Sequence, residues 1–130
     1  MSKTIEKSGK KGYNIFITNK GDSIMKIAVT YDNEQIFQHF GHTEQFKIYD
    51  IKKDEIISKT VVSTNGQGHG ALSSFLKEYN VDVLICGGIG GGAISALNEF
   101  GIKLFGGVSG DCDSAVESFL KNELNFNPNV

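Results

Sequence analysis

The sequence contains no tryptophan and no arginine, and it has one proline and two cysteines. The missing arginine removes the planar, bidentate group that usually reads phosphates and bases, which argues against nucleic acid as a partner. Two cysteines form neither a disulfide framework nor a CxxC motif, so we expect reduced thiols. No stretch approaches the length of a membrane span, and the start matches no signal or transit peptide. We therefore expect a cytoplasmic protein without a membrane partner.

Glycine is abundant in this 130-residue chain, with 16 copies against one proline. A chain of this length forms one domain around a single core. Because glycine adopts backbone conformations that other residues avoid, its positions should mark turns and close backbone approaches. Residues 25–130 carry 8 lysines and 13 carboxylates, so this part of the chain is acidic.

Residues 1–24 differ from the rest of the chain, because they are rich in lysine, serine and glycine. Met25 then opens an apolar stretch that is typical of a natural start at a first strand. We expect residues 1–24 to be an expression-derived or otherwise non-native leader, with a native amphipathic extension as the alternative. Residues 25–124 would form the domain, and residues 125–130 a frayed tail.

Hydrophobic periodicity after residue 24 predicts a series of strands and helices. Short apolar or alternating runs indicate strands, whereas apolar residues at helical spacing indicate three helices that follow glycine-rich turns. A polar turn and a loop are expected at residues 32–42, and a charged hairpin turn at residues 52–55. The five expected strands are residues 26–31, 46–51, 56–62, 81–86 and 102–105.

The expected order is β-β-β-α-β-α-β-α, an α/β class that packs most simply as a five-stranded mixed sheet covered by helices. The second strand should run antiparallel to the others, and right-handed crossovers should place the last two strands beyond the first. The loops after the first, third, fourth and fifth strands then meet at one sheet edge. Open α/β sheets bind their ligands at such an edge.

All three histidines and both cysteines are expected at this edge. Imidazole and thiolate are the side chains that hold zinc, copper, iron and iron–sulfur clusters. The candidate metal ligands are therefore His39, His42, His69, Cys86 and Cys112.

Each candidate ligand also has a purely structural interpretation. Cys86, at a strand end, is more typical of a small buried apolar residue than of a ligand. Cys112 lies in a first helical turn, where the helix dipole favours a thiolate but two flanking aspartates oppose it. His69 lies between two glycines, which leaves it open to a ligand, whereas His39 and His42 could simply hydrogen-bond loop carbonyls.

The glycine-rich loop at residues 87–92 matches G-x-G-x-x-G/A between an expected strand and an expected helix. The match is weak as a dinucleotide fingerprint, because Gly106 and Gly107 replace the acidic residue expected after the next strand. Open backbone N–H groups at a helix N-terminus still predict an anion site. The glycines expected to support a bound group are Gly41, Gly68, Gly70, Gly87, Gly88 and Gly90.

Catalysis has little support in the sequence. The nucleophile-elbow pattern G-x-S-x-G is absent, and no pair of carboxylates is suited to act as acid and base. Asp32 could serve a two-metal nuclease, but Glu78 is expected at the far end of its helix, so a second carboxylate is missing. We expect a protein that is not an enzyme.

Several segments together carry a resemblance that covers about residues 25–124. They are residues 25–29 (MKIAV), 39–42 (HFGH), 46, 48–50 (IYD), 68–70 (GHG), 83–90 (VLICGGIG) and 101–103 (GIK). In combination they resemble the dinitrogenase iron–molybdenum cofactor biosynthesis family, which includes nitrogenase accessory carriers and stand-alone single domains.

The resemblance implies a three-layer α/β/α ribonuclease H-like fold and non-catalytic binding or carrying of an iron–sulfur or iron–molybdenum cluster precursor. His39 and His69 match family positions best, and the loop at residues 87–92 matches as backbone support. His42 stands where many members have arginine, which marks it as a local substitution. Cys112 is not a general family position, so its role as a ligand rests on the sheet-edge argument alone.

The leading hypothesis is therefore a small metal-cluster carrier, whose partners are cluster donor and acceptor proteins and whose client need not be nitrogenase. Two or three ligands per chain would leave the cluster labile, and a homodimer could complete the coordination. One alternative is a nucleotide or small-anion binding module that uses the glycine-rich loop. The other is a regulatory interaction domain without a ligand.

Overall fold

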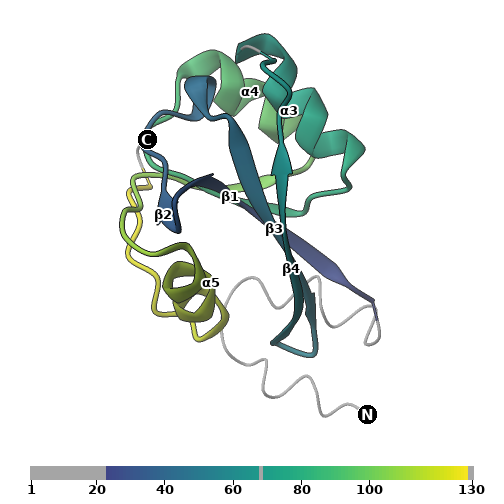
Figure 1. Ribbon diagram of the computed structural model, residues 1–130, viewed down its shortest axis with the longest axis vertical. Helices are drawn as coiled ribbons and strands as arrows, with labels where there is room; N and C mark the ends of the chain where they lie inside the picture. Colours follow the sequence, from purple (N-terminus) through teal and green to yellow (C-terminus); the bar gives the residue numbers. More distant parts are fainter. Residues whose placement is uncertain (1–22, 68, 129–130) are drawn as a thin grey trace.

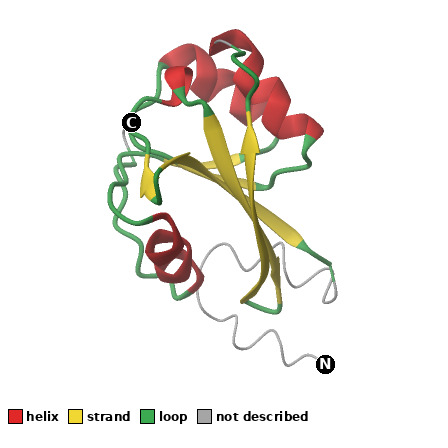
Figure 2. Cartoon of the chain, viewed as in Figure 1, coloured by secondary structure: helices red, strands yellow, loops and turns green. Residues whose placement is uncertain are grey.

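The computed structural model describes residues 23–67 and 69–128, and of His69 it describes the backbone. These residues form a mixed α/β fold with a six-stranded open sheet and three α-helices (Figures 1 and 2). The expectations for Gly68, for the His69 side chain and for the leader up to residue 22 lie outside the described residues.

The sheet contains strands of very different length. Its strands are β1 (Met25–Asp32), β2 (Gln35–Ile36), β3 (Gln45–Lys52), β4 (Glu55–Ser63), β5 (Val83–Ile85) and β6 (Lys103–Phe105). The helices are α3 (His69–Glu78), α4 (Gly91–Glu99) and α5 (Cys112–Leu120), together with the 3-10 helix η1 (Phe40–His42).

The strand order is β4-β3-β1-β5-β6, and β2 pairs with β1 off this path. Strand β3 runs antiparallel to both β1 and β4, whereas β5 is parallel to β1 and to β6. The antiparallel direction of the second long strand and the place of the last two strands agree with the sequence prediction. The turn between β3 and β4 has positive φ at Lys53 (53°) and Asp54 (64°), as in the tight turns that suit twisted hairpins.

The expectation of five strands was wrong, because the segment expected to be a turn and loop contains β2 and η1. In β2, Gln35 and Ile36 pair antiparallel with Asp32 and Tyr31 of β1. Ile36 is buried and belongs to the core beneath α5. A two-residue strand is too short to produce a recognisable alternation of apolar and polar residues.

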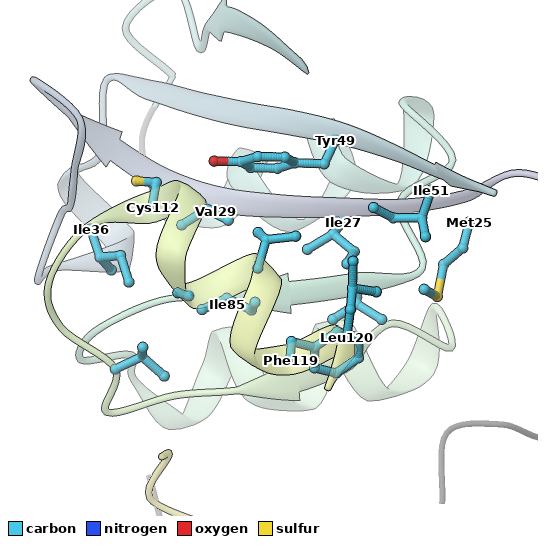
Figure 3. Packing of buried hydrophobic residues seen from close by; sticks show 14 residues of the cluster. Met25, Ile27, Val29, Ile36, Tyr49, Ile51, Ile85, Cys112, Phe119 and Leu120 are labelled. Carbon is cyan, nitrogen blue, oxygen red and sulfur yellow. The ribbon is translucent and has the colours of Figure 1, made fainter. Parts of the chain in front are cut away.

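Helices cover both faces of the sheet and create two hydrophobic cores. Side chains that point to opposite faces alternate along a strand, so Ile85 of β5 joins one core and Leu84 the other. On one face α5 packs on β1 and β3, and Figure 3 shows Ile27, Tyr49 and Phe119 in this cluster. On the opposite face α3 and α4 pack over the same strands. The sheet thus separates two sets of helices.

A network of charged groups fastens the start of α5 to the sheet. Asp113 Oδ1 accepts hydrogen bonds from Lys47 Nζ (2.9 Å) and Tyr49 OH (2.6 Å), and its Oδ2 accepts one from Lys59 Nζ (2.8 Å). Burial alone would raise the pKa of Asp113, but the hydrogen bonds from Lys59, Tyr49 and Lys47 outweigh it and hold that pKa well below its usual range. Asp113 is therefore a carboxylate at all ordinary pH values.

The last described residues lie against β6. The ring of Phe126 packs edge-on against Phe105, with centroids 4.9 Å apart, and the Asn127 N–H donates to the Gly106 carbonyl at 2.8 Å. The expected frayed tail thus has fixed contacts up to residue 127. Within the described residues, no helix has the length and apolar character required to cross a membrane.

Candidate functional site

A cavity of about 640 Å³ lies where η1 meets the starts of α3 and α4. These three elements gather at the upper end of the sheet in Figure 1. The walls of this cavity come from the segments that follow β1, β4 and β5 in the chain. These segments lie at the sheet edge where the sequence predicted a ligand, so we call it the rim cavity. It is lined by His39, Phe40, Gly41, His42, Gly70, Ser73, Gly88, Ile89, Gly90, Gly92, Ala93 and Ala96.

One wall of the rim cavity is fixed by pairing between two loops. The Gly88 N–H donates to the Gln38 carbonyl at 2.7 Å, and the Phe40 N–H donates to the Gly88 carbonyl at 3.0 Å. Phe40 is buried and its ring lies 6.0 Å from that of Phe46, which anchors η1 in the core shared with α3 and α4. The loop that carries the histidines is therefore held in place by backbone bonds and an aromatic anchor.

The histidines of η1 and its cap lie at the mouth of the rim cavity. His39 and His42 are both exposed and both line it. The His39 ring meets Phe37 edge-on at 6.0 Å, and the His42 N–H donates to the His39 carbonyl at 3.0 Å. The backbone of His69 begins α3, one residue before the lining residue Gly70. Two of the five expected ligands are thus in one cavity, and the backbone of a third adjoins it.

The cysteines do not join them, which corrects the expectation of five ligands on one rim. Cys86 is fully buried in the core under α3 and α4, whereas Cys112 is fully buried in the core under α5, on the opposite face of the sheet. Burial raises the pKa of each thiol to about 12. The place of each cysteine at a strand end or helix start predicts which edge of the sheet it lies near. It does not predict which face of the sheet the side chain packs against.

The polarity of the rim cavity favours an anion. Its described lining residues include no carboxylate and no lysine. Gly90 caps α4 without a side-chain hydrogen bond, and the first intrahelical bond runs from Ile94 N–H to the Gly90 carbonyl. The N–H groups of the first turn therefore have no partner within the helix and carry partial positive charge. No group of three or more His, Cys, Asp or Glu side chains in the described ranges is arranged to hold a metal ion.

The predicted glycines fall into two groups. Gly41, Gly70, Gly88 and Gly90 line the rim cavity, whereas Gly87 lies behind its wall and Gly68 is outside the described residues. Sequence patterns did not single out the other lining residues, such as Ser73. Its position three residues after Gly70 on one helix was an available signal, because residues at that spacing share a face.

The sequence matches the protein family described as dinitrogenase iron-molybdenum cofactor over residues 23–122. The chain belongs to this family. The resemblance found in the sequence is thereby confirmed.

Relatives of this family member have similar sequences and structures. An uncharacterized protein of Methanocaldococcus jannaschii is 29% identical over 106 residues, which span 78% of this chain and 90% of that protein. The crystal structure of PH0822 is 26% identical with a TM-score of 0.76, covering 80% of this chain and 96% of that one. The apo form of the orange protein from Desulfovibrio gigas shares the fold at 23% identity, with a TM-score of 0.67 and coverage of 82% and 96%.

Proposed function

We propose that this protein binds and carries an anionic iron–sulfur or iron–molybdenum cluster precursor in the rim cavity without altering the bonds of its cargo. The observation that carries this proposal is the composition of the cavity wall. The wall combines two exposed imidazoles with the unpaired N–H groups of a helix start, and its described residues include no carboxylate. Membership in a cofactor family supports a cluster over other anions.

The residues suit a cargo that is held loosely. His39 and His42 offer imidazole nitrogens at the mouth, and we propose His69 as a third ligand, while the backbone N–H groups of Gly91 and Gly92 balance negative charge. Neither thiol reaches the cavity from its core, so the cargo must bring its own sulfide. Few protein ligands leave a cluster easy to release, which a carrier requires.

Transfer requires donor and acceptor proteins, which we propose as the partners of this chain. The exposed edges of His39 and His42 lie where such a partner would approach the cargo. We also propose a cytoplasmic location and, for the fold, a ribonuclease H-like relationship, which helices on both sheet faces and the antiparallel β3 support.

Anaerobic loading of the full chain with iron and sulfide tests this function. We expect wild type to retain iron after desalting and to absorb visible light through sulfide-to-iron charge transfer. The double variant His39→Ala/His69→Ala should lose most of the iron and the absorption, because it removes two of the proposed ligands. Glu117→Ala is the matched control, since Glu117 is exposed on α5 at the opposite face of the sheet.

Two results would contradict the proposal in different ways. If wild type remains colourless and iron-free while a nucleotide raises its melting temperature, the nucleotide-binding alternative gains and the carrier function fails. If iron is retained equally by wild type and by the histidine double variant, the ligand assignment fails. In that case a second copy of the chain or other side chains would have to supply the ligands.

A further inference from the structure

We infer that a second pocket beside the rim cavity is a docking site for an arginine side chain of the protein that delivers or receives the cargo. This inference rests on the proposed carrier function, to which it adds the chemistry of the partner surface. The second pocket has a volume of about 170 Å³ and is lined by Tyr31, Asp32, Phe37, His42, Glu44 and Gln45. Because His42 lines both cavities, a side chain held here would bring the partner to the mouth of the rim cavity.

Two carboxylates of the second pocket are available to a cation. Asp32 ends β1 and Glu44 directly precedes β3, and both residues are exposed. Neither carboxylate forms an ion pair with another described residue, since the carboxylates that do so are Glu34, Asp50 and Asp113. The second pocket therefore carries two negative charges that no neighbouring cation balances within the described residues.

The lysines of the described residues are concentrated away from this end of the sheet. Six of the eight lie near the starts of β1 and β6, in the turn between β3 and β4, or at the ends of α3 and α5, and these are Lys26, Lys52, Lys53, Lys77, Lys103 and Lys121. The other two, Lys47 and Lys59, are both bonded to Asp113. A positive group for the second pocket is therefore expected to come from another molecule.

The aromatic wall of the second pocket favours arginine over lysine. Tyr31 and Phe37 line the pocket together with the carboxylates. The Tyr31 ring already lies near one cation, because Lys47 Nζ is 5.7 Å from the ring centre, but Asp113 at 2.9 Å and Glu34 at 3.5 Å balance that charge. A guanidinium is planar, stacks on aromatic rings and donates paired hydrogen bonds to carboxylates, whereas an ammonium is compact and more strongly hydrated. Rings and carboxylates in one pocket therefore suit arginine best.

The arginine must belong to a different protein. This sequence contains no arginine, so a second copy of the chain cannot supply one. Residues 25–130 also hold 8 lysines and 13 carboxylates, so two copies repel each other. A protein that exchanges an anionic cargo needs positive groups around its own binding site. Such a basic surface is electrostatically complementary to the second pocket.

A peptide titration of the full chain, followed by NMR of the backbone amides, tests the inference. The probe is acetyl-Gly-Arg-Gly-amide at low salt, and two matched peptides carry lysine or glutamine in place of arginine. We expect the arginine peptide to cause saturable shifts at residues 31–32 and 42–45. The lysine peptide should bind more weakly, and the glutamine peptide should not bind. Added salt should weaken the binding, because it screens exposed charges.

Variants separate the pocket from the overall charge of the chain. Asp32→Asn/Glu44→Gln should bind the arginine peptide about fivefold more weakly, because two charged contacts are lost. Glu99→Gln/Glu123→Gln is the matched control, since it changes the net charge equally at two exposed residues outside the pocket, and it should bind as wild type does. Phe37→Leu should weaken the binding about threefold, because it removes the ring but keeps an apolar side chain.

Three results would overturn the inference. They are an absence of saturable shifts with the arginine peptide, equal binding of the arginine and glutamine peptides, and equal weakening by the two double variants. The amide spectra of the variants without peptide show whether each variant is folded, so a loss of binding can be assigned to the pocket.

The iron–sulfide experiment separates failure of this inference from failure of the carrier function. If iron retention depends on the histidines but the arginine peptide does not bind, only the docking site is wrong. If the peptide binds at the second pocket but wild type retains no iron, the carrier function fails and the pocket stands as a docking site for a different partner. If wild type binds neither iron–sulfide nor the peptide, both proposals are wrong.

Discussion

A Cβ atom on Gly87 would lie 2.6 Å from Gln38 Cδ and 2.7 Å from Gln38 Cα. The two residues touch because the Gln38 side chain crosses behind the wall of the rim cavity, where its Nε2 donates to the carbonyls of Ile36 and Val108, both at 3.0 Å. Gln38 thereby ties together the loops that follow β2, β5 and β6. The absence of a side chain at residue 87 is what allows this junction to close.

Gly87→Ala should destabilise the protein by about 1–3 kcal/mol, because the new methyl group must displace Gln38 backbone as well as side chain. The free energy of unfolding in urea measures the effect. Gly92→Ala is the control, since nothing lies within 4 Å of its added Cβ. That change should leave stability unaltered or raise it by up to about 1 kcal/mol through helix propensity. Similar losses for both variants would contradict the close contact at Gly87.

Both cysteines should be unreactive in the folded protein. Burial holds each thiol pKa at about 12, so almost no thiolate is present for attack on a disulfide reagent near neutral pH. Titration with such a reagent should detect neither thiol in native protein and both in denaturant. In addition, Cys112→Ala should retain iron as wild type does. Rapid labelling of Cys112 in the folded protein, or loss of iron in Cys112→Ala, would contradict this prediction and would support Cys112 as a ligand.

The Asp113 network should make stability depend on pH in acid. The folded-state pKa of Asp113 is lowered, so its contribution is complete above the unfolded-state value of about 3.9 and is lost as pH falls towards the folded-state value. Asp113→Asn should therefore cost about 1–2 kcal/mol at neutral pH. Urea unfolding should show that the difference from wild type shrinks below about pH 4.

Glu55→Gln is the control for this titration, because Glu55 is exposed and makes no ion pair with another described residue. It should have little effect at either pH. A penalty for Asp113→Asn that is the same in acid and at neutral pH would show that packing, and not charge, fastens α5.

The N-terminus of α5 should also depend on its capping residue. Asp111 Oδ2 accepts from the Ser114 N–H at 2.9 Å and from the Ser114 hydroxyl at 3.1 Å. Asp111→Ala should lower the free energy of unfolding by about 0.5–2 kcal/mol. Asp111→Asn should recover most of this loss, because an amide oxygen can accept the same bonds. Failure of that rescue would show that the charge at Asp111 is what matters.

The sequence was sufficient to predict the long elements and the sheet edge, because each has a strong local signal. The helical spacing of Leu72 and Leu76 reflects one buried face, whereas the strand at residues 46–51 is buried on both faces, with Phe46 and Ile48 in one core and Tyr49 and Ile51 in the other. The chemistry at the edge was harder to predict. Cys86 and Cys112 lie at the ends of elements as expected, but they face different cores, and only tertiary packing determines that.

Ser73 is the converse case, because it lines the cavity although it was not predicted to. The spacing of Ser73 from Gly70 indicates that the two residues share a helix face. That this face lines a cavity depends on α4, which is about twenty residues further along the chain. Short elements could not be predicted from the sequence for a related reason. The strand β2 is stabilised by the burial of Ile36 and by its partner strand, so nothing within its own two residues predicts it.

Because both native thiols are buried, a labelled cysteine can be used to follow ligand binding to this protein. A cysteine introduced at an exposed position, such as Ser74→Cys on α3, would be the only sulfhydryl available to a fluorescent or spin-carrying reagent. A probe attached there would stand one residue from Ser73, yet outside the cavity wall. Its signal would then report binding and release of the proposed cargo in real time, without first removing either native cysteine.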